Sequence, residues 1–187
     1  MRRIKNILIA CSMLVNVISC QGKTSPAHKD YVSDAMLKNT TNDEHAFRLV
    51  LAQLKMLLKT KNLNASSALL NFPFFTARVS ENDRTGAATD PVAIGEYSKY
   101  KNDIFNADVI RLLPTYTEDQ LSEIDSKTDD PYYLSLTKLT DAGSQIYEVY
   151  FQYPEKGTNA ESFFGFVFGK VHGKYKAIGM YGKWPIK

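Results

Sequence analysis

SFFGFVFGKVHGKYKAIGMY, residues 162–181, is the stretch that decides the fold. Its first half alternates phenylalanine with smaller residues, the period-two pattern of a strand with one buried face. His172-Gly173 interrupts the alternation, and a second alternating run follows. A two-residue connection that contains glycine is typical of a tight turn between antiparallel strands. The stretch therefore predicts a β-hairpin with strands at Ser162–Val171 and Lys174–Tyr181.

The same alternation extends upstream of the hairpin. It predicts two further strands, at Tyr132–Leu139 and Gln145–Tyr153, so that the sheet has about four antiparallel strands. Before Asp130-Pro131 the apolar spacing is helical instead. This order, with helices first and a meander of strands afterwards, is an α+β pattern. In such a fold the helices cover one face of the sheet.

The helical part contains three recognisable start signals. Thr41 to Glu44 matches a capping box and precedes a helical apolar stripe that ends at Leu58. Asp90-Pro91 predicts a second helix, with Asp90 as N-cap and Pro91 in the first turn. A short helix at Ala107–Leu113 follows, and Thr117 to Gln120 predicts another helical turn through Ile124. The predicted inward residues of the second helix are Ile94, Tyr97, Ile104 and Phe105.

The N-terminus resembles a bacterial lipoprotein signal peptide. Basic residues precede an apolar stretch, and Val17-Ile18-Ser19-Cys20 is similar to a lipobox. The resemblance implies cleavage before Cys20 and attachment of lipid, including palmitate, to that residue. The apolar stretch is about twelve residues long, against roughly 20 for a membrane span. A plain cleaved signal and an uncleaved anchor are the alternatives.

The expected organisation is a signal peptide at residues 1–19, a flexible tether at 20–40 and one domain at 41–187. The resemblance implies a lipid-anchored protein of the bacterial cell envelope. Asp after the lipidated cysteine is the usual inner-membrane retention cue in enteric bacteria. Here Gln21 occupies that position, which favours the outer membrane over the inner one.

The basic excess of the chain belongs to the predicted signal peptide. The chain has 23 Lys+Arg and 20 Asp+Glu, a net charge of +3. Removing Arg2, Arg3 and Lys5 leaves 20 of each, so the mature chain is neutral. Nucleic-acid binding needs a concentrated basic surface, so no nucleic-acid partner is expected. Cys11 also lies in the signal, and the mature domain is therefore predicted to fold without a disulfide.

Short aromatic signatures resemble the NTF2-like (cystatin-like) α+β family, particularly its small exported bacterial members. They are Asn71-Phe-Pro-Phe74, the Tyr97-x2-Tyr100-x3-Ile104-Phe105 helix and the aromatic-rich strands. The resemblance covers roughly residues 41–182. It implies a curved sheet wrapped around a long helix, with a cone-shaped pocket between them. It also implies a homodimer through the open sheet face. The family includes enzymes, ligand binders and interaction modules, so the fold alone assigns no activity.

An aromatic-lined concavity would suit a small apolar ligand or a segment of a protein partner. The alternative is that these rings form the core. Trp184 either locks the C-terminal tail onto the sheet or is an exposed partner contact. The candidate lining residues are Phe72, Phe74, Tyr97, Phe105, Tyr147, Phe151, Phe164, Phe166 and Trp184.

The competing hypothesis is a small pocket enzyme of the isomerase or dehydratase type that uses a Tyr/Asp pair. Candidates for proton transfer are Asp103, Tyr97, Tyr100, Glu148 and Tyr150. Asp103 and Glu148 are expected to be solvated, the latter because it shares a strand face with Gln152, so no catalytic residue is assigned. No cofactor is expected. His28, His45 and His172 share no metal-binding spacing, so no metal site is predicted either.

Overall fold

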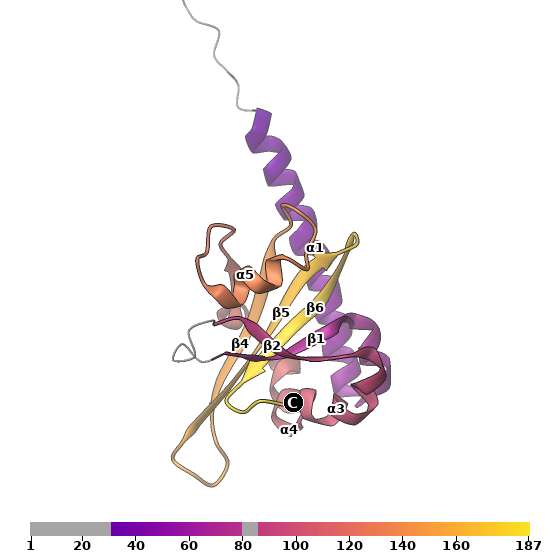
Figure 1. The fold of residues 1–187 in the computed structure, drawn as a ribbon, viewed down its shortest axis with the longest axis vertical. Helices are drawn as coiled ribbons and strands as arrows, with labels where there is room; N and C mark the ends of the chain where they lie inside the picture. The colour runs from indigo at the N-terminus through magenta and orange to yellow at the C-terminus, as the bar shows by residue number, and fades with distance from the viewer. Residues whose placement is uncertain (1–30, 80–85) are drawn as a thin grey trace, which may run out of the picture. The chain divides into compact units, whose positions relative to one another are not determined.

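The structure of the protein is a computed structural model. It describes residues 31–79 and 86–187, with side chains from Asn42 onward. The predicted signal peptide, Cys20, His28 and the first part of the predicted tether lie outside the described residues. The described chain is an α+β domain, in which helices pack against a six-stranded mixed sheet (Figure 1).

The sheet has the strand order β2-β1-β6-β5-β4-β3. All neighbouring strands are antiparallel except β1 and β6, which are parallel. The prediction of about four strands is therefore too low. The strands are β1 (Leu70–Arg78), β2 (Ala88–Val92), β3 (Leu121–Ile124), β4 (Ile146–Pro154), β5 (Glu161–Val171) and β6 (Lys174–Gly182).

The predicted β5–β6 hairpin is confirmed. His172 and Gly173 form its turn with φ of 50° and 78°. Positive φ at both central residues is the geometry that matches the twist of two antiparallel strands. The predicted strand Gln145–Tyr153 is also confirmed, as β4.

The predicted strand at Tyr132–Leu139 is wrong, because this segment contains helix α5 (Pro131–Thr137). Asp130 is its N-cap and accepts a hydrogen bond from Tyr132 N at 2.9 Å. The buried residues Tyr132 and Leu136 are four positions apart, which places them on one helical face. In so short a segment, alternation and helical spacing select overlapping positions.

The predicted start of the second helix at Asp90-Pro91 is wrong, because both residues lie in β2. β2 is at the edge of the sheet, where proline is tolerated. The helical region begins at η3 (Ile94–Glu96) and continues as α3 (Tyr97–Ile104). Tyr97, Ile104 and Phe105 are buried as predicted, whereas Ile94 is 62% exposed.

Helix α1 (Tyr31–Lys59) begins ten residues before the predicted start at Thr41. The capping-box pattern at Thr41–Glu44 therefore lies inside the helix. Asp43 faces inward with 1% exposure. It forms an ion pair with Lys170 Nζ at 3.0 Å and accepts a hydrogen bond from Gln145 N at 3.2 Å. The predicted apolar stripe is confirmed by the burial of Phe47, Leu51, Leu54 and Leu58.

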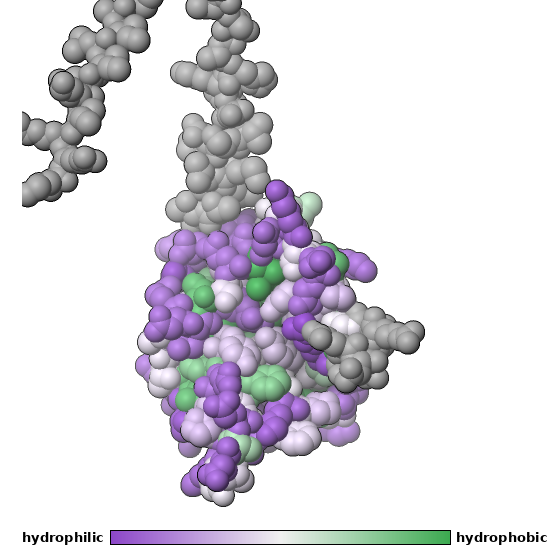
Figure 2. All heavy atoms as spheres, turned by 90° about the vertical axis from the view of Figure 1, so that its left-hand side faces the viewer, coloured by the Kyte–Doolittle hydropathy of each residue, from purple (hydrophilic) through white to green (hydrophobic). Residues whose placement is uncertain are grey.

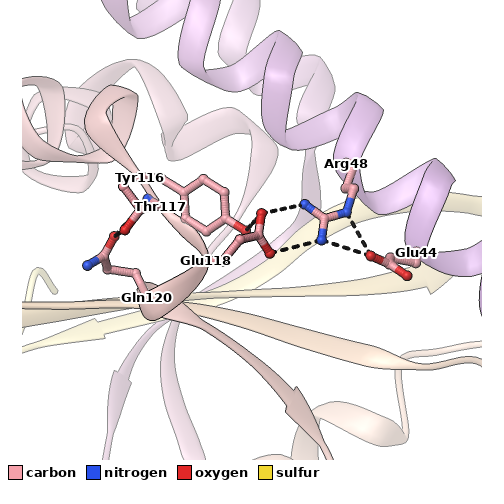
Figure 3. Close-up of polar contacts among 6 residues, drawn as sticks. All are labelled: Glu44, Arg48, Tyr116, Thr117, Glu118 and Gln120. Atoms are coloured by element: carbon pink, nitrogen blue, oxygen red, sulfur yellow. Dashed lines mark hydrogen bonds and ion pairs between the residues drawn. The ribbon is translucent and has the colours of Figure 1, made fainter.

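The second predicted capping box forms, since Thr117 N and Oγ1 lie 2.7 and 2.8 Å from Gln120 Oε1. It starts only the short η5 (Glu118–Gln120), after which the chain enters β3 instead of a helix. Arg48 of α1 contacts both Glu118 oxygens, at 2.8 and 3.0 Å, and also pairs with Glu44 (Figure 3). This exposed network connects α1 to the segment before β3.

The remaining helices and the larger core lie together on one face of the sheet. α2 (Leu63–Ser66) and η1 (Ser67–Leu69) follow α1, and α4 (Ala107–Leu112) and η4 (Leu113–Thr115) follow α3. Phe47 stacks on Tyr147 with ring centroids 4.4 Å apart, and Phe105 stacks on Phe166 at 5.9 Å. Aromatic packing thus joins α1 and the end of α3 to the strands.

The other face carries a smaller core beneath α5. A Cβ built at Gly169 would lie 2.5 Å from Thr140 Cγ2, and one at Gly179 would lie 3.4 Å from Leu136 Cδ2. The glycines therefore allow close packing over the sheet. The surface seen in Figure 2 is largely hydrophilic, with small and separate hydrophobic areas. Among the described residues, no helix has the length and apolar character needed to cross a membrane.

Candidate functional site

The C-terminal tail holds Trp184 at the surface. Lys183 N donates a hydrogen bond to Phe163 O at 3.2 Å, and Lys183 Nζ pairs with Glu155 at 2.7 Å. On the other side of Trp184, Ile186 packs against the larger core and Lys187 Nζ pairs with Glu96 at 2.7 Å. The tail is thus fixed both before and after Trp184, whose side chain is nevertheless 72% exposed. Tryptophan is highly buried on average, so this exposure marks a candidate contact residue.

Trp184 borders a surface groove of about 400 Å³. The groove lies between the start of α4, the end of β4, the start of β5, the end of β6 and the C-terminal tail. Its lining includes both aromatic and polar side chains. The lining residues are Asn106, Asp108, Tyr153, Glu155, Lys156, Ser162, Phe163, Phe164, Met180, Gly182, Lys183, Trp184 and Ile186.

The lining of the groove contains equal numbers of acidic and basic side chains. Two acids, Asp108 and Glu155, and two bases, Lys156 and Lys183, line it. Asp108 is paired with Arg111 at 2.6 Å, outside the lining. The hydrogen bond from Lys183 lowers the pKa of Glu155, which is therefore ionised at neutral pH. The groove consequently presents polar groups without a large field of either sign.

The structure divides the predicted lining residues between the groove and the core. Phe164 and Trp184 line the groove. Phe72 packs against the larger core and is half-buried, and Tyr97 Oη donates a hydrogen bond to Leu63 O. Burial raises the pKa of Tyr97 to about 12. The core members are Phe74, Tyr97, Phe105, Tyr147, Phe151, Phe164 and Phe166.

Tyr153, Phe163, Met180 and Asn106 were not among the predicted lining residues. They come from four separate segments, and no local spacing relates them. The strand register, which pairs Phe164 with Gly182 and Tyr153 with Ser162, brings the three strand segments to one end of the sheet, and Asn106 is the N-cap of α4.

A second feature is a buried carboxyl group on the opposite face of the sheet, beneath α5. Glu148 is only 7% exposed, so the prediction that it is solvated is wrong. Its Oε1 accepts hydrogen bonds from Tyr133 Oη and Tyr181 Oη, both at 2.9 Å. Gln152 on the same strand face is exposed as predicted.

The surroundings of Glu148 shift the pKa of its carboxyl group. Burial raises its pKa, and the two tyrosine hydrogen bonds oppose part of that shift. Arg78 lies nearby, pairs with Asp130 at 2.7 Å and stacks over the Tyr132 ring at 5.4 Å. Among the described residues, Tyr132 Oη is a buried hydroxyl without a hydrogen-bond partner. Burial is thus the largest influence on the pKa of Glu148, and the net direction of the shift is upward.

The other proposed proton-transfer residues do not converge on Glu148. Tyr97 belongs to the core on the opposite face, and Asp103 is exposed. Tyr150 packs against the smaller core, with its ring 6.5 Å from that of Tyr181. Glu148 is absent from the lining of the groove and of two further surface cavities in the described chain.

His45 and His172 are both exposed. Within residues 31–79 and 86–187, no group of three or more His, Cys, Asp or Glu is placed to hold a metal ion.

Comparison with protein-family models finds no match for this chain, and comparison with curated proteins finds none either. The site is therefore interpreted from its own geometry.

Proposed function

We propose that this protein is a lipid-anchored protein of the bacterial cell envelope whose domain is a non-catalytic binding module. The lipobox-like Val17-Ile18-Ser19-Cys20 supports the anchor. The position of Gln21 favours the outer membrane. The ligand is a small molecule with an apolar part or a segment of an envelope protein.

The proposed finer classification is NTF2-like. A long helix packs on one face of the sheet, and an antiparallel β1–β2 hairpin joins the other strands through the parallel β1–β6 pair. These features support a sheet wrapped around α1. Helix α5 covers part of the opposite face, so the proposed homodimer would use the part of that face that α5 leaves open. Sedimentation equilibrium of the full chain in detergent tests this assembly.

The observation that carries the binding function is Trp184, exposed within a tail that is fixed on both sides and bordering a groove. A large exposed ring beside a concavity provides apolar contact area at little cost in side-chain entropy. The aromatic residues of the larger core are already occupied by packing against one another.

The anchor is tested by metabolic labelling with palmitate in the native cell. The wild-type chain is expected to incorporate label and to fractionate with the outer membrane. Cys20→Ala should abolish labelling and release the domain, whereas Cys11→Ala, within the predicted signal, is the matched control. Labelling of the Cys20→Ala protein would contradict the proposal.

The second candidate is the pocket enzyme, which the Tyr133–Glu148–Tyr181 cluster favours because it joins a buried carboxyl group to two phenols. Proton-transfer chemistry also needs access for a substrate to Glu148. Turnover of an enolisable ketone that is lost in Glu148→Gln but retained in Trp184→Ala would establish this function.

A further inference from the structure

We propose that the groove beside Trp184 binds a neutral saccharide. This inference rests on the proposed binding function and specifies the ligand class of that site.

The first argument is the arrangement of rings in the groove. Trp184 and Tyr153 both line it, and Trp184 is far more exposed than the other aromatic rings there. Tyr153 is held in place by Phe164, at a centroid distance of 6.0 Å, and by Arg111 over its ring at 5.9 Å. A sugar ring has an apolar C–H face and a rim of hydroxyl groups. Packing that face on an indole removes apolar surface from water and leaves the hydroxyls at the edge.

The second argument is the type of polar group around the rings. Asn106, Asp108, Glu155 and Ser162 supply amide, carboxylate and hydroxyl groups. Asp108 and Glu155 are ion-paired and Asn106 Oδ1 caps α4, but covering such charged and polar groups with a purely apolar ligand would still cost desolvation free energy. A ligand that carries several hydroxyls can both donate to the carboxylates and accept from the amide.

The third argument is charge. The lining contains two acids and two bases, and each acid is already paired with a cation. An anionic ligand such as a nucleotide would meet Asp108 and Glu155, and a cationic ligand would meet Lys156 and Lys183. With Arg111 included, these groups sum to one positive charge, that of Lys156, so the groove has no concentrated charge that would select a strongly ionic ligand.

The position of the groove favours a saccharide over an extended peptide. A peptide that adds to a sheet needs an edge strand with free backbone groups. The edges of this sheet are β2 and β3, whereas Ser162 and Gly182 of the groove belong to the paired strands β5 and β6. At this site, β5 and β6 therefore have no free edge with which such a peptide could form main-chain hydrogen bonds.

Trp184 is the only tryptophan of the chain, so its fluorescence reports on the groove. The full-length protein, purified in detergent, would be titrated with neutral oligosaccharides of glucose, N-acetylglucosamine, mannose and galactose. At least one of them should change the emission saturably. Calorimetry should then show that Trp184→Ala weakens this binding about tenfold or more. Ile94→Ala, which removes an exposed apolar side chain outside the groove, should bind as the wild type does.

Three results overturn the inference and are distinguishable from one another. If no saccharide binds but an envelope peptide library or the uncharged apolar dye Nile red changes Trp184 emission, the binding function survives and the ligand class is wrong. If nothing changes the emission, both are wrong. Saccharide binding that is unaffected by Trp184→Ala would also contradict the assignment to this groove.

Discussion

Tyr181 Oη of β6 donates a hydrogen bond to Glu148 Oε1 of β4 at 2.9 Å, although β5 lies between these two strands. The contact is made because the Tyr181 ring passes over Gly165 of β5. A Cβ built at Gly165 would lie only 2.7 Å from two atoms of that ring. The absence of a side chain on the middle strand thus allows the outer two to be joined by a buried hydrogen bond.

Gly165→Ala is expected to destabilise the domain by about 1–3 kcal/mol, because the new methyl group overlaps the Tyr181 ring. The free energy of unfolding would be measured by urea denaturation. Gly95→Ala is the matched control, since a Cβ there meets nothing within 4 Å, and it should change stability by less than about 0.5 kcal/mol. Equal effects of the two substitutions would contradict the packing of Tyr181 over Gly165.

Glu148→Gln is expected to raise the free energy of unfolding at pH 7. Burial raises the folded-state pKa of Glu148 above the ordinary value of 4.5, so its ionisation opposes folding. The penalty is absent well below pH 4.5, grows as pH rises through the folded-state pKa and is complete above it. Each unit of pKa difference corresponds to about 1.4 kcal/mol. Glutamine keeps the acceptor oxygen but cannot ionise.

The comparison of wild type and Glu148→Gln between pH 4 and pH 8 checks this prediction. The stability difference should widen in favour of glutamine as pH increases. Glu148→Ala should instead destabilise at every pH, by about 2–4 kcal/mol, because it leaves the hydroxyls of Tyr133 and Tyr181 without their acceptor. A stability difference between wild type and Glu148→Gln that is independent of pH would contradict the raised pKa.

Asp43→Ala is expected to lower the free energy of unfolding by about 2–3 kcal/mol. The substitution removes the buried partner of Lys170 and the acceptor of Gln145 N. Asp103→Ala, at an exposed position, serves as the control in the same denaturation measurement. Similar stability of Asp43→Ala and wild type would show that α1 is held without this ion pair.

Trp184 should emit as a water-exposed indole in the folded protein, because its side chain is 72% exposed. Unfolding in urea should therefore shift its emission maximum little, and iodide should quench it in both states. Circular dichroism recorded in parallel would show when the domain unfolds. A large red shift at that transition would mean that the indole is buried in the folded protein.

Local sequence patterns predicted those elements whose determining residues all lie within the element itself. The β5–β6 hairpin is one case, because alternation and the His172-Gly173 turn agree. The segment at Tyr132–Leu139 was assigned to the wrong structure because positions four apart satisfy both periods. The edge strand β2 was missed because a proline within it is also a helix-start signal.

The site was less predictable than the fold because its residues meet only through tertiary packing. Glu148 was expected to resemble Gln152, its neighbour on the same strand face, but α5 brings Tyr133 over one and leaves the other exposed. For Trp184, the sequence allows two alternatives, a residue that locks the tail onto the sheet and an exposed partner contact. Its exposure follows from contacts of Lys183 and Lys187 with residues far away in the sequence.

The length of α1 has a structural consequence. The first buried side chain described on this helix is Asp43, and Tyr31–Asn42 continue the helix past the end of the sheet (Figure 1). At 1.5 Å per residue, these twelve residues span about 18 Å. Under the proposed attachment at Cys20, this helical extension lies in the chain between the anchor and the part of α1 that packs on the sheet. Figure 1 places the C-terminus toward the end of the domain opposite to the start of α1.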